Sequence, residues 1–133
     1  MSSGKILIID DDQDIVHQTQ EILVKAGYTV CCANTSADAF KRLRSFLPDL
    51  ILLDLVLPDE SGFRVAQKIK SSERFKAIPI IAASFKKDAI DKHIAAKNGI
   101  VEYLEKPINR ERLLFCIRDI VGMDREQSEA GWD

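Results

Sequence analysis

The sequence predicts an α/β domain built around a parallel sheet of five strands, with five helices connecting and covering the strands. One observation is that two short runs, residues 5–9 and 50–53, are almost entirely apolar. Strands of this composition are typical of parallel sheets, in which both faces are buried. A second observation is that apolar runs alternate five times with helical patterns, which indicates β-α-β units. The length of 133 residues and the apolar content of 46% fit one self-sufficient domain.

The first half of the chain is expected to hold strands at residues 5–9, 28–33 and 49–53, with two helices between them. Asp12 is a candidate N-cap for the first helix, and Gly27 is a stop signal after it. Ser36 is a candidate N-cap for the second helix, which we expect Pro48 to end. Helical spacing predicts the buried faces of these helices: Ile15, Thr19, Ile22, Leu23 and Ala26 in the first, and Ala37, Phe40, Leu43 and Leu47 in the second.

The second half is expected to hold three helices and strands at residues 80–83 and 101–104. Pro79 opens the first of these strands, and Gly99 ends a helix that begins at about residue 87. The last helix follows Asn109. The residues expected to face the core are Val65, Ala66 and Ile69, then Ile90, Ile94 and Ala95, then Leu113, Leu114, Ile117, Ile120 and Val121. We expect residues 1–121 to form the domain and the polar residues 122–133 to be a frayed end or the start of a linker.

The composition argues against several classes of function. A formal net charge of −2 gives no electrostatic basis for binding nucleic acid or an acidic membrane. Cys31, Cys32 and Cys116 form no C-x-x-C pair, so we interpret them as reduced, small core residues. No segment approaches the roughly 20 apolar residues that a membrane span needs, and no signal peptide is expected. These observations favour a cytoplasmic protein.

Acidic residues follow two of the expected strands. Asp10, Asp11 and Asp12 come directly after the first strand, and Asp54 follows the third. Ligands of such sheets bind outside the carboxyl ends of the strands, so these carboxylates should gather at one edge. Packed carboxylates repel one another, and a hard divalent cation relieves the repulsion. Taken singly, Asp10 and Asp11 could equally be helix caps or loop acids, and Asp54 a turn residue.

The ends of the fourth and fifth strands strengthen this prediction. Ser84 provides a hydroxyl that can donate a hydrogen bond to an anion, and Lys106 provides an ammonium group. Pro107 favours an extended or turn backbone at Lys106, which could direct the lysine over the sheet edge. Four of the five expected strands therefore place a charged or hydroxyl group at the same edge. This combination indicates a metal-dependent site for phosphate chemistry.

In these residues the chain resembles the receiver domain of two-component response regulators, and the resemblance extends from residue 5 to residue 121. That family has an acidic pair after the first strand, Asp after the third, Thr or Ser after the fourth and Lys-Pro after the fifth. It also has Pro and Gly four and eight positions beyond the phosphoacceptor Asp, and often an aromatic residue three positions before the lysine. The matching residues are Asp10-Asp11, Asp54, Ser84, Lys106-Pro107, Pro58, Gly62 and Tyr103.

The resemblance implies a flavodoxin-like, doubly wound domain with strand order 2-1-3-4-5, and it implies a phosphotransfer mechanism. Asp54 would be the nucleophile that accepts a phosphoryl group. Mg²⁺ would be bound by Asp11, Asp54 and the backbone carbonyl of Val56, with Asp10 reaching it through water. Lys106 would pair with Asp54 before the transfer and with a phosphate oxygen after it.

The resemblance also implies a conformational switch and positions that tune it. Ser84 would donate to a second phosphate oxygen, and its inward shift would let Tyr103 turn inward, although Tyr103 is equally well explained as a half-buried strand tyrosine. A small residue usually occupies the position of Phe85, so its ring either restricts access to the site or packs outward. Val56 and Lys86 stand at variable positions that tune the phosphoryl lifetime in this family.

The implied function is a phosphorylation-operated switch of a two-component phosphorelay. It would accept a phosphoryl group from a sensor histidine kinase or a histidine phosphotransfer protein. It would catalyse only its own phosphorylation and dephosphorylation, so it is not an enzyme in the usual sense. The resemblance is compatible with a homodimer through the surface of the fourth and fifth helices and the strand between them. Direct binding of nucleic acid or membrane by this domain is not expected.

Three alternatives are weighed against this function. A phosphatase of the haloacid dehalogenase-like pattern needs a second Asp two residues after the nucleophile, where this chain has Val56. A nucleotide-binding module needs a glycine-rich loop after the first strand, where this chain has three aspartates. A phosphorylation-independent interaction module, or pseudo-receiver, is the main alternative, and a phosphotransfer assay separates it from the switch.

Overall fold

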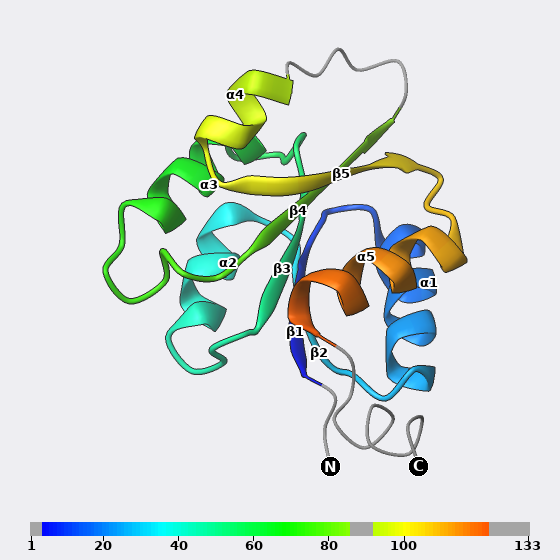
Figure 1. The fold of residues 1–133 in the computed structure, drawn as a ribbon. Helices are drawn as coiled ribbons and strands as arrows, with labels where there is room; N and C mark the ends of the chain where they lie inside the picture. The colour runs from blue at the N-terminus through cyan, green and yellow to red at the C-terminus, as the bar shows by residue number, and fades with distance from the viewer. Residues whose placement is uncertain (1–3, 86–91, 123–133) are drawn as a thin grey trace.

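A computed structural model describes residues 4–85 and 92–122. Five strands form one parallel sheet in the order β2-β1-β3-β4-β5 (Figure 1). The strands are β1 (Lys5–Ile9), β2 (Thr29–Ala33), β3 (Leu50–Asp54), β4 (Ile80–Phe85) and β5 (Ile100–Lys106). The helices are α1 (Gln13–Lys25), α2 (Ser36–Leu43), α3 (Gly62–Lys70), α4 (Lys92–Lys97) and α5 (Arg110–Val121). The predicted α/β class and strand order are confirmed.

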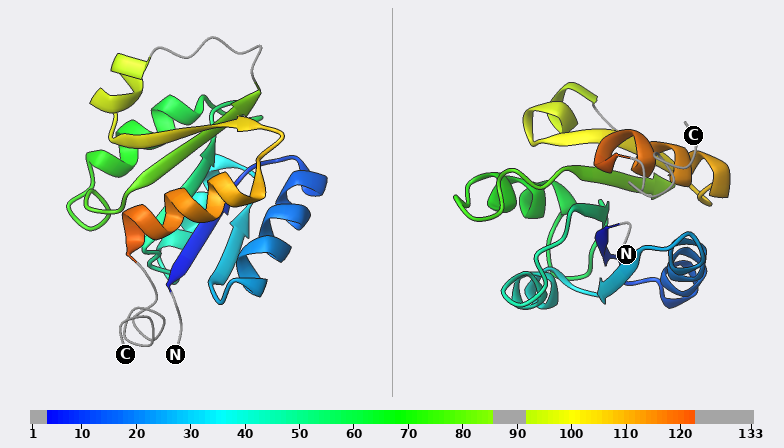
Figure 2. Two further views of the ribbon diagram at one scale, coloured as in Figure 1. Left: turned by 45° about the vertical axis from the view of Figure 1, so that its right-hand side comes forward. Right: turned by 60° about the horizontal axis from the view of Figure 1, so that its bottom comes forward.

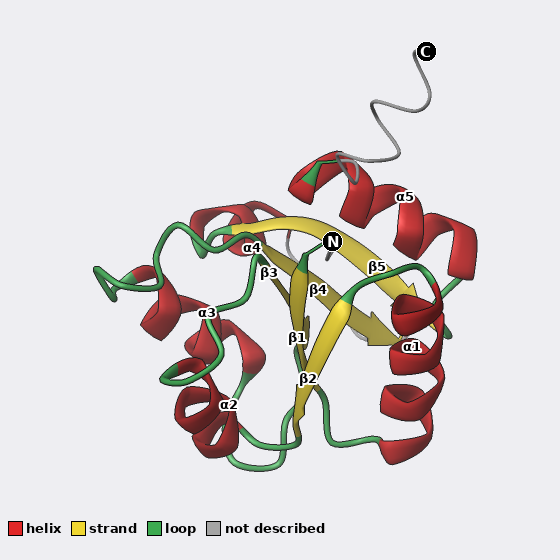
Figure 3. Ribbon diagram, turned by 90° about the horizontal axis from the view of Figure 1, so that it is seen from below, coloured by secondary structure: helices red, strands yellow, loops and turns green. Residues whose placement is uncertain are grey.

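The twisted sheet lies between two layers of helices (Figure 2). Helices α1 and α5 cover one face, and α2, α3 and α4 cover the other (Figure 3). In β1, Ile6 and Ile8 pack with the α1 and α5 layer, whereas Leu7 and Ile9 pack with the opposite layer. All four side chains are buried. This burial on both faces explains why the strand sequence is continuously apolar.

The prediction for α2 was wrong at both ends. Thr35 is its N-cap, and its side chain accepts a hydrogen bond from the Asp38 N–H at 3.0 Å. The helix ends at Leu43, well before Pro48. The buried face consists of Ser36, Ala39 and Leu43, while Ala37 and Leu47 are exposed. The face containing Ser36 follows helical spacing as well as the predicted face does, so spacing alone could not distinguish them.

The prediction for α4 needs a similar correction. Ala95 is buried as expected, but Ile94 is 48% exposed. In α5, Cys116 joins Leu113 and Ile117 on the buried face, while Leu114, Ile120 and Val121 are only half-buried. Cys31 and Cys32 are also half-buried. The predicted start of the fourth helix, with Ile90, Lys86 and the tail at residues 123–133, lies outside the described residues.

Several boundaries predicted for loops and caps agree with the structure. Asp12 is the N-cap of α1, Asn109 is the N-cap of α5, and α3 buries Val65, Ala66 and Ile69. The strands β3, β4 and β5 end one or two residues later than expected, so Asp54, Ser84 and Lys106 lie within strands and not after them. Across the described ranges, 4–85 and 92–122, no helix has both the length and the apolar character to cross a bilayer.

Candidate functional site

Three carboxylates meet at the carboxyl edge of the sheet. Asp10 and Asp11 follow β1, and Asp54 is the last residue of β3, which pairs with β1 in register at Ile9 and Leu53. Each of the three aspartates offers an oxygen, and these oxygens lie within 4.8 Å of one another. Asp10 and Asp54 are buried, and Asp11 is exposed. The arrangement therefore opens to solvent on the side of Asp11.

Backbone groups orient the two buried carboxylates. Asp10 Oδ1 accepts a hydrogen bond from the Asp12 N–H at 2.9 Å, and the Asp10 N–H donates to the carbonyl oxygen of Ala33 at 3.0 Å. Asp54 Oδ1 accepts from the Val56 N–H at 3.1 Å. The Asp12 side chain instead accepts from the first-turn N–H groups of α1. The Asp12 side chain thus caps α1, while Asp10 and Asp11 belong to the carboxylate cluster.

Lys106, at the carboxyl end of β5, contributes a buried cation to the same edge of the sheet. Its side chain is only 2% exposed, and its Nζ lies 2.7 Å from Asp10 Oδ2 and 3.4 Å from Asp54 Oδ2. The shorter contact is with Asp10, whereas the resemblance suggested Asp54 as the partner. One ammonium group therefore lies between both buried carboxylates and leaves the cluster with more negative than positive charge.

The Asp54 carboxyl is electrostatically perturbed. The pKa of Asp54 is raised to about 6, mainly by burial and also by the negative charge of Asp10. The hydrogen bond from the Val56 N–H and the charge of Lys106 oppose this rise. The surroundings of Asp54 thus disfavour its ionised form. A cation bound at the cluster would favour the ionised form.

The donor set suits Mg²⁺. The carboxylate oxygens of Asp10, Asp11 and Asp54 are hard ligands, and Mg²⁺ commonly uses one or two carboxylates together with water. The exposed position of Asp11 leaves room for water on one side of the cluster. The described residues therefore contain an acidic pocket whose chemistry fits this ion.

Two residues of β4 lie next to the cluster. Ser84 is buried, with only 1% of its surface exposed. In the pairing of β4 with β5, Ser84 lies opposite Glu105 and Phe85 lies opposite Lys106. Phe85 is 41% exposed, and the centroid of its ring lies 5.4 Å from Lys106 Nζ, within the range of a cation–π contact. The ring is therefore close to the cation of the site while part of it faces solvent.

Gly62 shows why the motif requires a glycine eight residues after Asp54. A Cβ atom at Gly62 would lie 2.5 Å from the backbone oxygen of Asp54 and 2.6 Å from the Cα of Leu55. The Gly62 N–H also donates to the Leu55 carbonyl at 2.9 Å. Any side chain at this position would push α3 away from the strand that carries Asp54.

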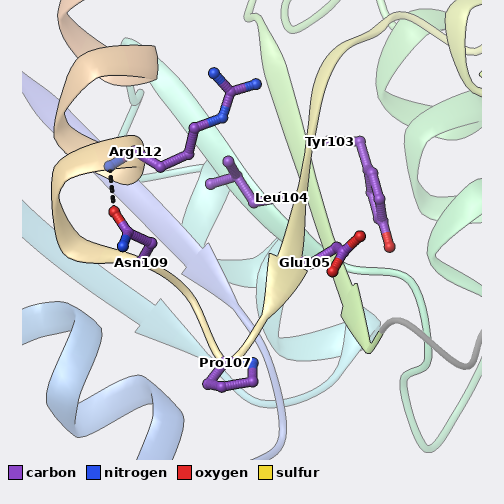
Figure 4. A pocket seen from close by; sticks show the side chains of 6 residues that line it. All are labelled: Tyr103, Leu104, Glu105, Pro107, Asn109 and Arg112. Atoms are coloured by element: carbon purple, nitrogen blue, oxygen red, sulfur yellow. Dashed lines mark hydrogen bonds between the residues drawn. The ribbon is translucent and has the colours of Figure 1, made fainter.

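Tyr103 lies further along β5 and outside the acidic cluster. It is half-buried and packs against the core on the side of α2, α3 and α4. With Glu105, Pro107 and Arg112 it lines an open groove (Figure 4). Figure 4 shows Tyr103 on one side of β5 and Leu104 on the other, as strand alternation requires. Tyr103 thus contacts the core and also borders the open groove on the surface.

The remaining predicted tuning positions differ in how they lie. Val56 is 61% exposed, and its contact with the cluster is the hydrogen bond that its backbone N–H donates to Asp54. Lys86 lies outside the described residues.

The pattern of the sequence did not predict that Asp59, which lies in the loop after Val56, contacts the start of α2. No spacing rule connects these segments, because 23 residues separate Asp59 from Ser36.

Comparison with known proteins identifies the family to which the chain belongs. Residues 6–118 match the family model for the response regulator receiver domain. The chain is 31% identical to PilH of Pseudomonas aeruginosa, over 89% of this chain and 98% of PilH. It is 34% identical to the transcriptional regulatory protein GltR of the same organism, over 87% of this chain and 48% of GltR. The chain thus spans about half the length of GltR.

A solved structure with a similar fold is the receiver domain of the sensor histidine kinase PA1611 from Pseudomonas aeruginosa. It superposes with a TM-score of 0.81 at 25% identity and covers 91% of this chain and 99% of that one. That structure holds a magnesium ion coordinated in its active-site cleft. With the family model matched over residues 6–118 and the acidic, hydroxyl and lysine groups at one sheet edge, this chain belongs to the response regulator receiver domain family.

Proposed function

We propose that the chain is a phosphorylation-operated switch that accepts a phosphoryl group on Asp54 from a histidine kinase or a histidine phosphotransfer protein. The observation that carries the proposal is the convergence of Asp10, Asp11 and Asp54 within 4.8 Å, with Lys106 bridging the two buried carboxylates. A full set of acid, hydroxyl and lysine is what phosphoryl transfer needs and what a pseudo-receiver does not. The pseudo-receiver alternative is therefore not favoured.

The metal site follows from the same residues. Asp10, Asp11, Asp54 and the backbone carbonyl of Val56 would hold Mg²⁺. When bound, Mg²⁺ would offset the negative charge on the transferring phosphoryl group. The magnesium ion in the related PA1611 receiver domain supports this assignment. Asp10 also has a second role, because it accepts a charged hydrogen bond from Lys106 at 2.7 Å and holds that ammonium beside Asp54.

In the transfer step, a carboxylate oxygen of Asp54 attacks phosphorus and forms an acyl phosphate. The phosphorus–nitrogen bond of the donor phosphohistidine breaks, and the imidazole nitrogen keeps the electron pair and then takes a proton. Lys106 would exchange its contact with Asp54, now 3.4 Å away, for a phosphate oxygen. The Ser84 hydroxyl would donate to another phosphate oxygen. Hydrolysis by water would later release inorganic phosphate and restore the Asp54 carboxylate.

Tyr103 would carry the signal outward. Its half-buried position beside the core of the α4 side suits a ring that turns inward once Ser84 engages the phosphate. The surface of α4, β5 and α5 would then change where it meets a partner or a second copy of the chain. Exposed apolar residues on this surface, Ile94 and Val101, support an interaction role. We place the protein in the cytoplasm, where histidine kinases present their phosphorylated domains.

The test is to incubate the protein with acetyl phosphate or phosphoramidate and Mg²⁺ and to measure the intact mass. We expect one base-labile phosphoryl group in the unaltered chain and none in Asp54→Asn. Asp119→Asn, an exposed change on α5, is the matched control and should be phosphorylated normally. An adduct that persists in Asp54→Asn would place the acceptor elsewhere, and no adduct in any variant would favour the pseudo-receiver.

A further inference from the structure

The loop between β3 and α3, residues 55–61, is closed at its base. The Val56 N–H donates to Asp54 Oδ1 at 3.1 Å, and Val56 also forms an antiparallel bridge with Ser61. These contacts tie the start of the loop to the end of the strand that carries the phosphoacceptor. The position of the Val56 backbone, whose carbonyl is the proposed metal ligand, therefore depends on how firmly this loop is held.

The tip of the loop is held by a second element of the fold. The Asp59 carboxylate accepts three hydrogen bonds from the start of α2: the Ser36 N–H at 3.0 Å, the Ser36 hydroxyl at 2.7 Å and the Ala37 N–H at 3.1 Å. The bonds from the Ser36 N–H and hydroxyl lower the pKa of Asp59 to about 2. Ser36 is itself buried, so the contact joins the loop to a fixed point of the core.

This contact is more than an ordinary helix cap. Thr35 already caps α2 by accepting from the Asp38 N–H at 3.0 Å. Asp59 lies 23 residues further along the chain and takes different N–H groups of the same turn. A local residue would satisfy those donors without ordering a distant loop. The use of Asp59 therefore joins α2 to the metal-side loop as well as capping the helix.

The residue after Asp59 anchors the same loop to α3. Glu60 forms ion pairs with Lys68 at 3.0 Å and with Arg64 at 3.6 Å, and its side chain is 16% exposed. Asp59 is exposed, but its partner Ser36 is buried, and the bond from the Ser36 hydroxyl at 2.7 Å is shorter than either ion pair of Glu60, whose partners Lys68 and Arg64 are exposed. Of the two anchors, Asp59 should have the larger effect on the loop, since exposed ion pairs contribute little.

We propose that Asp59 is a positioning residue of the metal site, because its carboxylate anchors the loop to Ser36 and thereby fixes the Val56 backbone beside Asp54. The inference rests on the proposed function, in which Mg²⁺ is bound by Asp54 and the Val56 carbonyl. Mg²⁺ requires near-ideal octahedral geometry, so a ligand that fluctuates lowers its affinity. Residues behind the ligands of a metal commonly change affinity for this reason.

The experiment compares the full chain with Asp59→Ala, Asp59→Asn and the control Thr35→Ala. Mg²⁺ itself is the probe, and its affinity is measured from amide chemical shifts. Hydrogen exchange of the Val56 N–H is measured separately without metal. We expect Asp59→Ala to weaken Mg²⁺ binding about tenfold and to speed exchange at Val56. Asp59→Asn keeps one acceptor oxygen and should restore part of both properties.

The control separates positioning from helix capping. Thr35→Ala removes a cap from α2 without touching the loop, so it should lower the melting temperature but leave Mg²⁺ affinity and Val56 exchange unchanged. If Asp59→Ala behaves in the same way as Thr35→Ala, the inference is overturned. If Asp59→Ala does not fold, Ser36→Ala and Asp59→Asn decide the matter, and unchanged affinity in both would overturn it. Failure of the unaltered chain to bind Mg²⁺ would instead overturn the proposed function itself.

Discussion

At the scale of single residues, the site depends on groups that are held by more than one neighbour. Lys106 contacts Asp10, Asp54 and the ring of Phe85 at once. Asp10 in turn is oriented by the Asp12 N–H. Because each contact restricts the next, small changes at the rim of the site should alter its chemistry without unfolding the domain.

Phe85→Ala tests this at the rim of the site. The ring lies over the Lys106 ammonium and covers one approach to it, so it should hinder water that attacks the phosphorylated Asp54. We expect Phe85→Ala to speed autodephosphorylation by a factor of a few, which corresponds to roughly 1 kcal/mol of barrier. The decay of phosphorylated protein gives the measurement. Phe115→Ala, which removes an exposed ring on α5, is the control. Unchanged decay with weakened partner binding would assign Phe85 to the interaction surface.

Asp59 gives a pH prediction for stability. Its folded pKa, about 2, lies below its ordinary value, so its stabilising effect is complete above pH 4 and declines as the pH falls toward 2. The difference in melting temperature between the unaltered chain and Asp59→Asn should therefore be constant near neutral pH and shrink in acid. Thermal unfolding at several pH values in metal-free buffer measures it. A difference that grows in acid would contradict the hydrogen bonds to Ser36 as its source.

At the scale of secondary-structure elements, the turn between α4 and β5 requires a particular residue. The turn between α4 and β5 contains Gly99 at φ +79°, a conformation that side chains rarely adopt. The Lys70 side chain passes over this glycine, and its Nζ donates to the carbonyl oxygens of Lys76 and Ile78 at 2.8 and 3.1 Å. One lysine thus packs the end of α3 against the turn that leads into β5.

Gly99→Ala should destabilise the domain for two separable reasons. The positive φ costs about 1–2 kcal/mol for a residue with a Cβ. The added Cβ would also meet the Lys70 side chain, and that part should be relieved in the double variant Gly99→Ala/Lys70→Ala. Urea unfolding of Lys70→Ala and of both glycine variants separates the terms. Equal stability of the unaltered chain and Gly99→Ala would show that the turn tolerates a side chain.

At the scale of the whole molecule, metal binding should stabilise the fold. An ion that binds only the folded chain adds about 2.7 kcal/mol at a concentration one hundred times its dissociation constant. Urea unfolding with and without Mg²⁺ should show this gain in the unaltered chain. Asp11→Asn should lose most of it, because it removes an exposed ligand and leaves the buried contacts in place. An equal gain in both proteins would remove Asp11 from the metal site.

The sequence allowed the architecture to be predicted because burial on both faces leaves a plain mark on strands such as β1 and β3. It also predicted Asp10, Asp11 and Asp54 as a cluster, since parallel strands end at one edge. The face of α2 could not be predicted, because spacing fits Ala37 as well as Ala39. The partner of Lys106 and the contact of Asp59 with Ser36 depend on side-chain distances between remote segments, which a single sequence does not contain.

The ion pair between Asp10 and Lys106 joins residues 96 positions apart. During synthesis, the first aspartates emerge from the ribosome long before the lysine that pairs with them. Contacts between such distant residues form only after most of the chain is available, because closing a long loop must precede them. A nascent chain without β5 would therefore carry the acidic cluster but not its cation. The complete charge arrangement of the site is in this sense a late property of the growing polypeptide, acquired with the last strand.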